Sequence, residues 1–141
     1  MILLDTSGVL AAIDSSQRDH RHAAAALRDA PGPRVLSPFV LSELDYLLAT
    51  RVGPHAALAL LAEVARGAYR LESFEAGDVA MACEVIESHG DLDVGLADAS
   101  IVVLSRRYET LDVLTLDERH FRTLRGSTGQ PFRILPADDP R

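Results

Sequence analysis

Four acidic side chains in this sequence stand where carboxylates could act together: Asp5, Glu43, Asp98 and Asp117. Asp5 and Asp117 close the apolar runs "ILLD" and "VLTLD", which are typical of buried β-strands, and the other two lie in helical patterns. Clustered carboxylates repel one another unless cations share them, and such hard oxygen ligands suit Mg²⁺ or Mn²⁺. One or two such ions would support phosphoryl chemistry, because they activate water and stabilise charge on the phosphate.

Short apolar runs alternate with longer helical stretches along the whole chain. The strong helix start at Ser37 and Pro38 is typical of this pattern, because serine caps a helix and proline is favoured at its first position. Continuous apolar strands separated by helices favour a parallel sheet covered on both faces. We therefore expect an α/β fold, a three-layer α/β/α sandwich with a central parallel sheet of four to five strands. The expected strands are 2–5, 34–37, 69–73, 112–117 and 132–135, and the expected helices are 6–13, 18–29, 38–51, 55–66, 75–88 and 94–107.

This architecture would bring the acids together. Parallel sheets place ligands at the carboxyl ends of their strands, so Asp5 and Asp117 point to one edge. Glu43 lies in the second turn of helix 38–51, close to the strand end that precedes it. Asp98 shares a helix face with apolar residues, and an unpaired buried charge is costly. The chain contains no lysine, so an arginine or a metal ion must compensate Asp98.

Each acid also has a structural alternative. Asp5 and Asp117 could each cap the helix that follows, and Glu43 could be a solvated boundary residue. His120 lies close to Asp117 and could touch a substrate, although a surface role is the simpler interpretation.

Length and composition limit the class of protein to which this chain can belong. A length of 141 residues fits one domain, 1–141, and 48% hydrophobic with 25% charged residues is ordinary for a soluble globular protein. We expect no signal peptide and no membrane span. Cys83 is the only cysteine, which excludes an intrachain disulfide and favours a cytoplasmic location. We expect its side chain to lie in the core. A net charge of -7 disfavours non-specific nucleic-acid binding, unless metal ions make the site locally positive.

At these residues the sequence resembles a known family. "MILLDTSGVLAAI", "SPFVLSELDYLL", "LADASIVVLSRR" and "VLTLDERHF" resemble the four acidic motifs of PIN domains, and their spacing is similar to that of VapC-type toxins, from residue 1 to about 135. The resemblance implies that Asp5, Glu43, Asp98 and Asp117 bind one or two Mg²⁺ or Mn²⁺ ions and catalyse hydrolysis of RNA, such as tRNA or rRNA. Thr6 or Ser7 would position metal-bound water or the site backbone, and Thr115 could hydrogen-bond into the site.

The same resemblance implies partners. One is a VapB-like antitoxin that covers the active site, and the other is a second copy of the chain in a homodimer. We expect no membrane partner. The leucine- and alanine-rich hairpin 38–66 could expose apolar surface for either partner. For RNA, arginines near the acids could grip phosphates, although they could equally be solvated surface charges. These arginines are Arg106, Arg107, Arg119, Arg122 and Arg125.

Other functions are less well supported by the sequence or remain open as alternatives. A haloacid-dehalogenase-type phosphatase needs a second acid where Ser7 stands, and both it and a phospho-acceptor receiver domain need a lysine. A PIN-fold nuclease of RNA processing that is not a toxin remains an alternative, as does a PIN-fold binding module with weak catalysis. The intact acidic quartet argues against the binding module.

Overall fold

The centre of the protein is a five-stranded parallel sheet. The computed structural model describes residues 1–139. The strand order is β3-β2-β1-β4-β5, and every neighbouring pair is parallel. The strands are β1 (Ile2–Leu4), β2 (Arg34–Leu36), β3 (Arg70–Leu71), β4 (Asp112–Leu114) and β5 (Arg133–Leu135).

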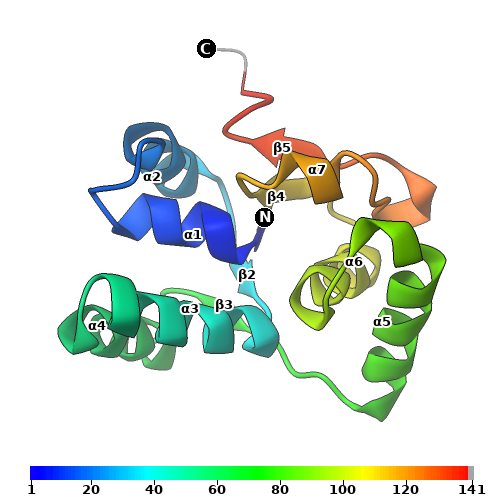
Figure 1. The fold of residues 1–141 in the computed structure, drawn as a ribbon, viewed down its shortest axis with the longest axis horizontal. Helices are drawn as coiled ribbons and strands as arrows, with labels where there is room; N and C mark the ends of the chain where they lie inside the picture. Colours follow the sequence, from blue (N-terminus) through cyan, green and yellow to red (C-terminus); the bar gives the residue numbers. More distant parts are fainter. Residues whose placement is uncertain (140–141) are drawn as a thin grey trace.

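Helices cover both faces of this sheet. In Figure 1 the helices α1 to α4 lie to the left of the sheet and α5 and α6 lie to the right. The expected three-layer α/β/α sandwich with a parallel sheet of four to five strands is therefore confirmed. The helices are α1 (Thr6–Ile13), α2 (His20–Asp29), α3 (Pro38–Arg51), α4 (Pro54–Ala65), α5 (Ala76–Ser88), α6 (Leu96–Tyr108) and α7 (Glu118–Phe121), with short 3₁₀ turns η1 (Gly90–Leu92) and η2 (Ser127–Gly129).

The sheet changes winding direction at β1. The chain passes from β1 outward to β2 and β3, and then crosses to β4 on the other side of β1. Such a switch point opens a crevice at the carboxyl ends of the two central strands. Residues 2–4 are at most 1% exposed, so the core fixes this edge firmly. The residues that follow β1 and β4 are consequently brought side by side.

Helix α1 packs against the end of β4 so closely at Gly8 that a side chain there would clash. A Cβ added at Gly8 would lie 2.5 Å from the carbonyl oxygen of Leu114. The Asp5 amide donates to the same oxygen at 3.0 Å. Gly8 therefore lets α1 begin directly against β4, and this contact sets where Asp5 lies.

Several strands are shorter than expected from the sequence. The strand expected at 112–117 ends at Leu114, and Asp117 is instead the N-cap of α7. The strand expected at 69–73 has two residues, both exposed at the sheet edge. The last two residues of the expected domain 1–141 lie outside the described residues.

Two surface features complete the fold. Cys83 was expected in the core but is exposed, because Ala82 and Val85 are the residues of this turn that face inward. The hairpin of α3 and α4 does expose large apolar side chains, as expected, at Tyr46, Val52, Leu58 and Leu61. Within residues 1–139, no helix has the length and apolar character needed to cross a membrane.

Candidate metal centre

Asp5 is buried at the carboxyl end of β1. Only 5% of the residue is exposed, and its side chain makes no capping hydrogen bond to α1. Instead the hydroxyl of Thr115 donates to Oδ2 at 2.6 Å and the hydroxyl of Ser7 donates to the same oxygen at 2.9 Å. Burial raises the pKa of Asp5 to about 6, although these hydroxyls oppose the rise and the nearby charge of Asp98 adds to it. The capping alternative for Asp5 is therefore wrong.

Backbone amides orient both hydroxyls. Ser7 Oγ accepts from the amide of Leu116 at 2.9 Å, and Thr115 Oγ1 accepts from the amide of Asp117 at 2.9 Å. Each hydroxyl has one proton, so accepting from an amide leaves that proton to be donated to Asp5. The loop after β4 thus holds the carboxylate of Asp5 at a fixed angle.

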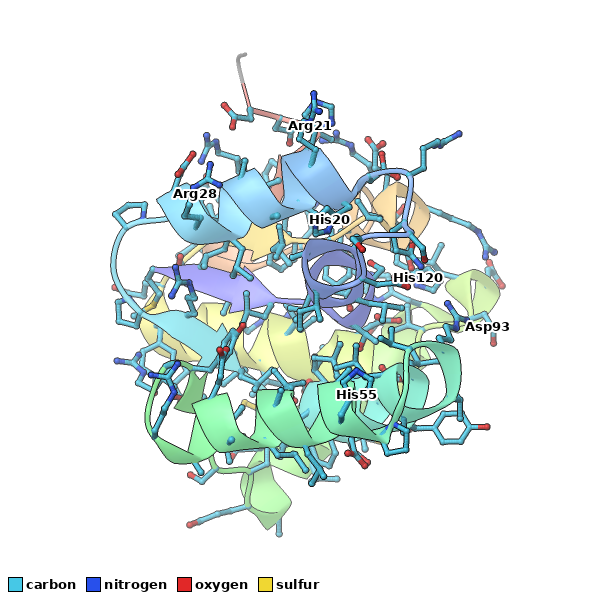
Figure 2. The ribbon with its side chains drawn as sticks, turned by 90° about the vertical axis from the view of Figure 1, so that its left-hand side faces the viewer. His20, Arg21, Arg28, His55, Asp93 and His120 are labelled. Carbon is cyan, nitrogen blue, oxygen red and sulfur yellow. The ribbon has the colours of Figure 1, made fainter. Side chains whose placement is uncertain are left out.

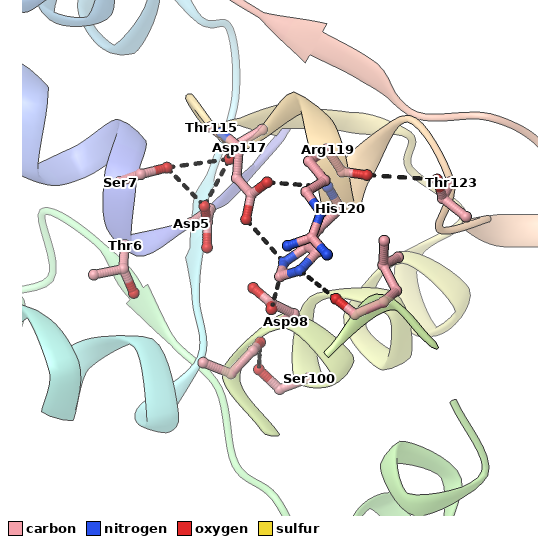
Figure 3. Close-up of polar contacts among 12 residues, drawn as sticks. Asp5, Thr6, Ser7, Asp98, Ser100, Thr115, Asp117, Arg119, His120 and Thr123 are labelled. Carbon is pink, nitrogen blue, oxygen red and sulfur yellow. Dashed lines mark hydrogen bonds and ion pairs between the residues drawn. The ribbon is translucent and has the colours of Figure 1, made fainter. Parts of the chain in front are cut away.

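Asp98, Asp117 and His120 form a second group that faces Asp5 (Figure 3). His120 Nδ1 lies 3.1 Å from Oδ2 of Asp98 and 2.8 Å from Oδ2 of Asp117. Asp117 also caps α7, since its Oδ1 accepts from the His120 amide at 3.0 Å. The capping alternative for Asp117 is therefore correct, and it accounts for one oxygen of the carboxylate only.

Glu43 approaches from α3. The residue is exposed, and its Oε1 accepts a hydrogen bond from the hydroxyl of Thr6 at 2.7 Å. Thr6 is the first residue of α1, so this contact links α3 to the end of β1. Thr6 therefore contacts Glu43, whereas Ser7 and Thr115 contact Asp5.

The charges of the four acids are coupled through Asp98. Burial raises the pKa of Asp98, His120 opposes that rise, and the charges of Asp117 and Glu43 add to it. Asp98 in turn raises the pKa of Asp5. The expectation that an arginine or a metal must compensate Asp98 missed the histidine. The only signal for this histidine in the sequence is that His120 follows Asp117 by three residues in a helical segment. The surface role expected for His120 is wrong, because its ring lies against Asp98 and Asp117.

The arginines expected around the site differ from one another. Arg107 contacts Glu72 and Asp78, each at 3.1 Å, so its charge is engaged within the fold. Arg122 is similarly held by Glu118 at 2.8 Å and Asp138 at 2.7 Å. All five are exposed, but within residues 1–139 the other three have no ion pair: Arg106 at the end of α6, Arg119 on α7 next to His120, and Arg125.

The ligand set fits a divalent ion. Among residues 1–139, one atom each from Asp98, Asp117 and His120 lie within 4.8 Å of one another. The buried carboxylate of Asp5 lies close enough to Asp98 to interact electrostatically. Carboxylate oxygens and an imidazole nitrogen are ligands that first-row divalent metals share.

Known proteins are similar to this chain in sequence. The PIN domain model matches residues 2–126. Ribonuclease VapC26 of Mycobacterium tuberculosis is 42% identical over 135 residues, which cover 96% of this chain and 100% of the relative. The chain belongs to the PIN-domain family, and its close sequence relatives there include a VapC ribonuclease.

Solved structures agree with this assignment. VapC20 of Mycobacterium tuberculosis, a sarcin-ricin loop cleaving toxin, superposes with a TM-score of 0.77 at 26% identity, over 83% of this chain and 90% of that one. The Rickettsia felis VapBC2 complex, bound to a promoter DNA fragment, has a TM-score of 0.64 at 18% identity, over 95% of this chain and 98% of that one. The second likeness supports the fold alone.

Proposed function

We propose that this protein is a metal-dependent endoribonuclease and the toxin of a toxin–antitoxin pair. The observation that carries the proposal is the meeting of Asp5, Asp98, Asp117 and Glu43 at the switch point of the sheet. The relative at 42% identity bears the name ribonuclease, which supports RNA as the substrate.

Asp5, Asp98 and Asp117 would hold one or two Mg²⁺ or Mn²⁺ ions, with Glu43 at the open side. A divalent ion bound there supplies a Lewis acid that lowers the pKa of water and neutralises charge on the scissile phosphate. The protein's own contribution is positioning: Ser7 and Thr115 fix Asp5, and Thr6 fixes Glu43. The exposed Arg106 and Arg119 would contact RNA phosphates.

We also propose a VapB-like antitoxin and a homodimer. The family resemblance implies both partners. The exposed apolar side chains of α3 and α4 offer a surface on which one of them could bury apolar area.

The first test is cleavage of RNA. The purified protein, free of partners, is incubated with total cellular RNA in Mg²⁺, Mn²⁺ or EDTA, and new 5′ ends are mapped by sequencing. We expect discrete cuts that need metal and disappear in Asp98→Asn, whereas Asp45→Asn, an exposed acid on α3, cuts like the wild type. Cutting that survives EDTA or Asp98→Asn would refute the mechanism.

A second test addresses the toxin role. Induced expression of the wild type should arrest growth of a bacterial host, while Asp98→Asn should not. A folded protein that cuts RNA but leaves growth unchanged would favour a PIN nuclease of RNA processing instead. A folded protein that binds Mn²⁺ without cutting any RNA would favour a binding module.

A further inference from the structure

The ring of His120 is held in one orientation by the turn before α6. Its Nε2 lies 2.7 Å from the carbonyl oxygen of Leu92. A carbonyl can only accept, so Nε2 carries a proton and donates it. In the neutral ring the other nitrogen, Nδ1, then has a free lone pair.

Nδ1 is directed at the acidic group but has no satisfactory hydrogen bond. Carboxylate oxygens of Asp98 and Asp117 lie 3.1 Å and 2.8 Å away, yet neither lies at a hydrogen-bonding angle. Among residues 1–139 it is the only buried side-chain nitrogen or oxygen without a hydrogen-bond partner. Such an atom is rare in native proteins, and a missing ligand is one of the usual reasons.

We propose that His120 is itself a ligand of the divalent ion, through Nδ1, together with Asp98 and Asp117. Metal-binding histidines commonly donate their other ring proton to a backbone carbonyl, which fixes the ring and its tautomer. The bond from His120 to Leu92 is of this kind. The inference rests on the proposed metal-dependent function and adds a nitrogen to its oxygen ligands.

A nitrogen ligand changes which metal the site prefers. Mg²⁺ favours oxygen ligands, whereas an imidazole suits later first-row ions. The protein should therefore bind Mn²⁺ and Co²⁺ more tightly than Mg²⁺, and loss of the imidazole should reduce this preference.

A second role for His120 would explain the same contacts. A protonated His120 could act as a resident cation that neutralises Asp98 and Asp117 in place of a metal. The two roles predict opposite effects on affinity, because removing a ligand weakens metal binding and removing a competing cation strengthens it.

The experiment uses the purified full chain and Mn²⁺ alone, without RNA. Mn²⁺ affinity is measured by calorimetry for the wild type, His120→Ala, His120→Gln and the control His55→Ala. His55 is an exposed histidine on α4 (Figure 2), and all variants are first checked for folding by circular dichroism. We expect the His120 variants to lose affinity by about tenfold or more, and His55→Ala to match the wild type.

A spectroscopic measurement needs no variant. Pulsed electron paramagnetic resonance of the Mn²⁺ complex should show coupling to a histidine nitrogen, which disappears in His120→Ala and stays in His55→Ala. No nitrogen coupling in the wild type, or equal or tighter Mn²⁺ binding by the His120 variants, would overturn the proposal. Nitrogen coupling in a protein that cuts no RNA would instead refute the proposed function alone.

Discussion

Thr115 donates a hydrogen bond of 2.6 Å to Asp5 although the two residues are 110 positions apart in the chain. The contact exists because β4 pairs with β1 in parallel register, so the residues after both strands lie at one edge. Since Thr115 also accepts from the Asp117 amide, one hydroxyl orders two of the four acids. This relationship makes Thr115 a positioning residue for the whole site.

Replacing that hydroxyl should weaken both the fold and the site. Thr115→Val keeps the shape of the side chain but leaves the Asp117 amide without its acceptor and Asp5 with one hydroxyl fewer. We expect a loss of about 1–3 kcal/mol in the free energy of unfolding, measured by urea denaturation. Losing a donor also raises the pKa of Asp5 further. Thr115→Ser keeps the hydroxyl and should stay close to the wild type; equal losses in both variants would show that the methyl group matters instead.

The stability of the metal-free protein should depend on the protonation of Asp5. Its pKa rises from 3.8 unfolded to about 6 folded, so the folded state binds more protons between these values and loses stability as the pH rises through about 6. The lost free energy is about 3 kcal/mol at neutral pH, at 1.36 kcal/mol per pH unit. Burial raises the pKa of Asp98 as well, which acts in the same direction.

Comparison with Asp5→Asn isolates this effect from the other acids. The variant should be more stable than the wild type at pH 7.5 without divalent ions, and the difference should vanish near pH 4. Added Mn²⁺ should stabilise the wild type more than the variant, because the ion favours the charged carboxylate of Asp5 while Asp98, Asp117 and His120 remain in both proteins. Thermal melting at several pH values measures both; a stability difference that does not change with pH would contradict the assignment to Asp5.

Gly8 should be intolerant of even one methyl group. Gly8→Ala places a Cβ 2.5 Å from the Leu114 carbonyl oxygen, so α1 or β4 must shift. We expect a loss of about 1–3 kcal/mol in unfolding free energy, together with reduced RNA cleavage because Asp5 moves with α1. Gly77→Ala is the matched control: it lies in α5 with no atom near its added Cβ, and should be neutral or stabilising by up to about 1 kcal/mol. Similar losses in the two variants would refute the close-approach argument.

Arg119 should contribute to RNA binding without contributing to the fold. It is exposed on α7, beside the proposed ligand His120. Arg119→Gln in the Asp98→Asn background, which keeps bound RNA intact, should bind RNA more weakly. The slope of log affinity against log salt should fall by about 0.7 if one phosphate contact is lost. Arg28→Gln, at the exposed end of α2, serves as the control, and a slope equal to that of the control would exclude Arg119 from the interface.

The sequence by itself determined the architecture and the four acids. Alternating apolar runs and helical periodicity are local signals, so they predict the parallel sheet, the helix from Pro38 to Arg51 and the partial burial of Asp98 without any knowledge of neighbours. The motif resemblance then identified Asp5, Glu43, Asp98 and Asp117 as one group.

Only the tertiary structure decided which atoms meet. The convergence of Ser7 and Thr115 on one oxygen of Asp5 depends on β4 lying next to β1. The orientation of His120 depends on a carbonyl 28 residues earlier in the chain. Likewise, the exposure of Cys83 follows from which face of α5 packs against α6. Sequence patterns report the period of burial along one element, whereas these contacts depend on how separate elements are placed against one another.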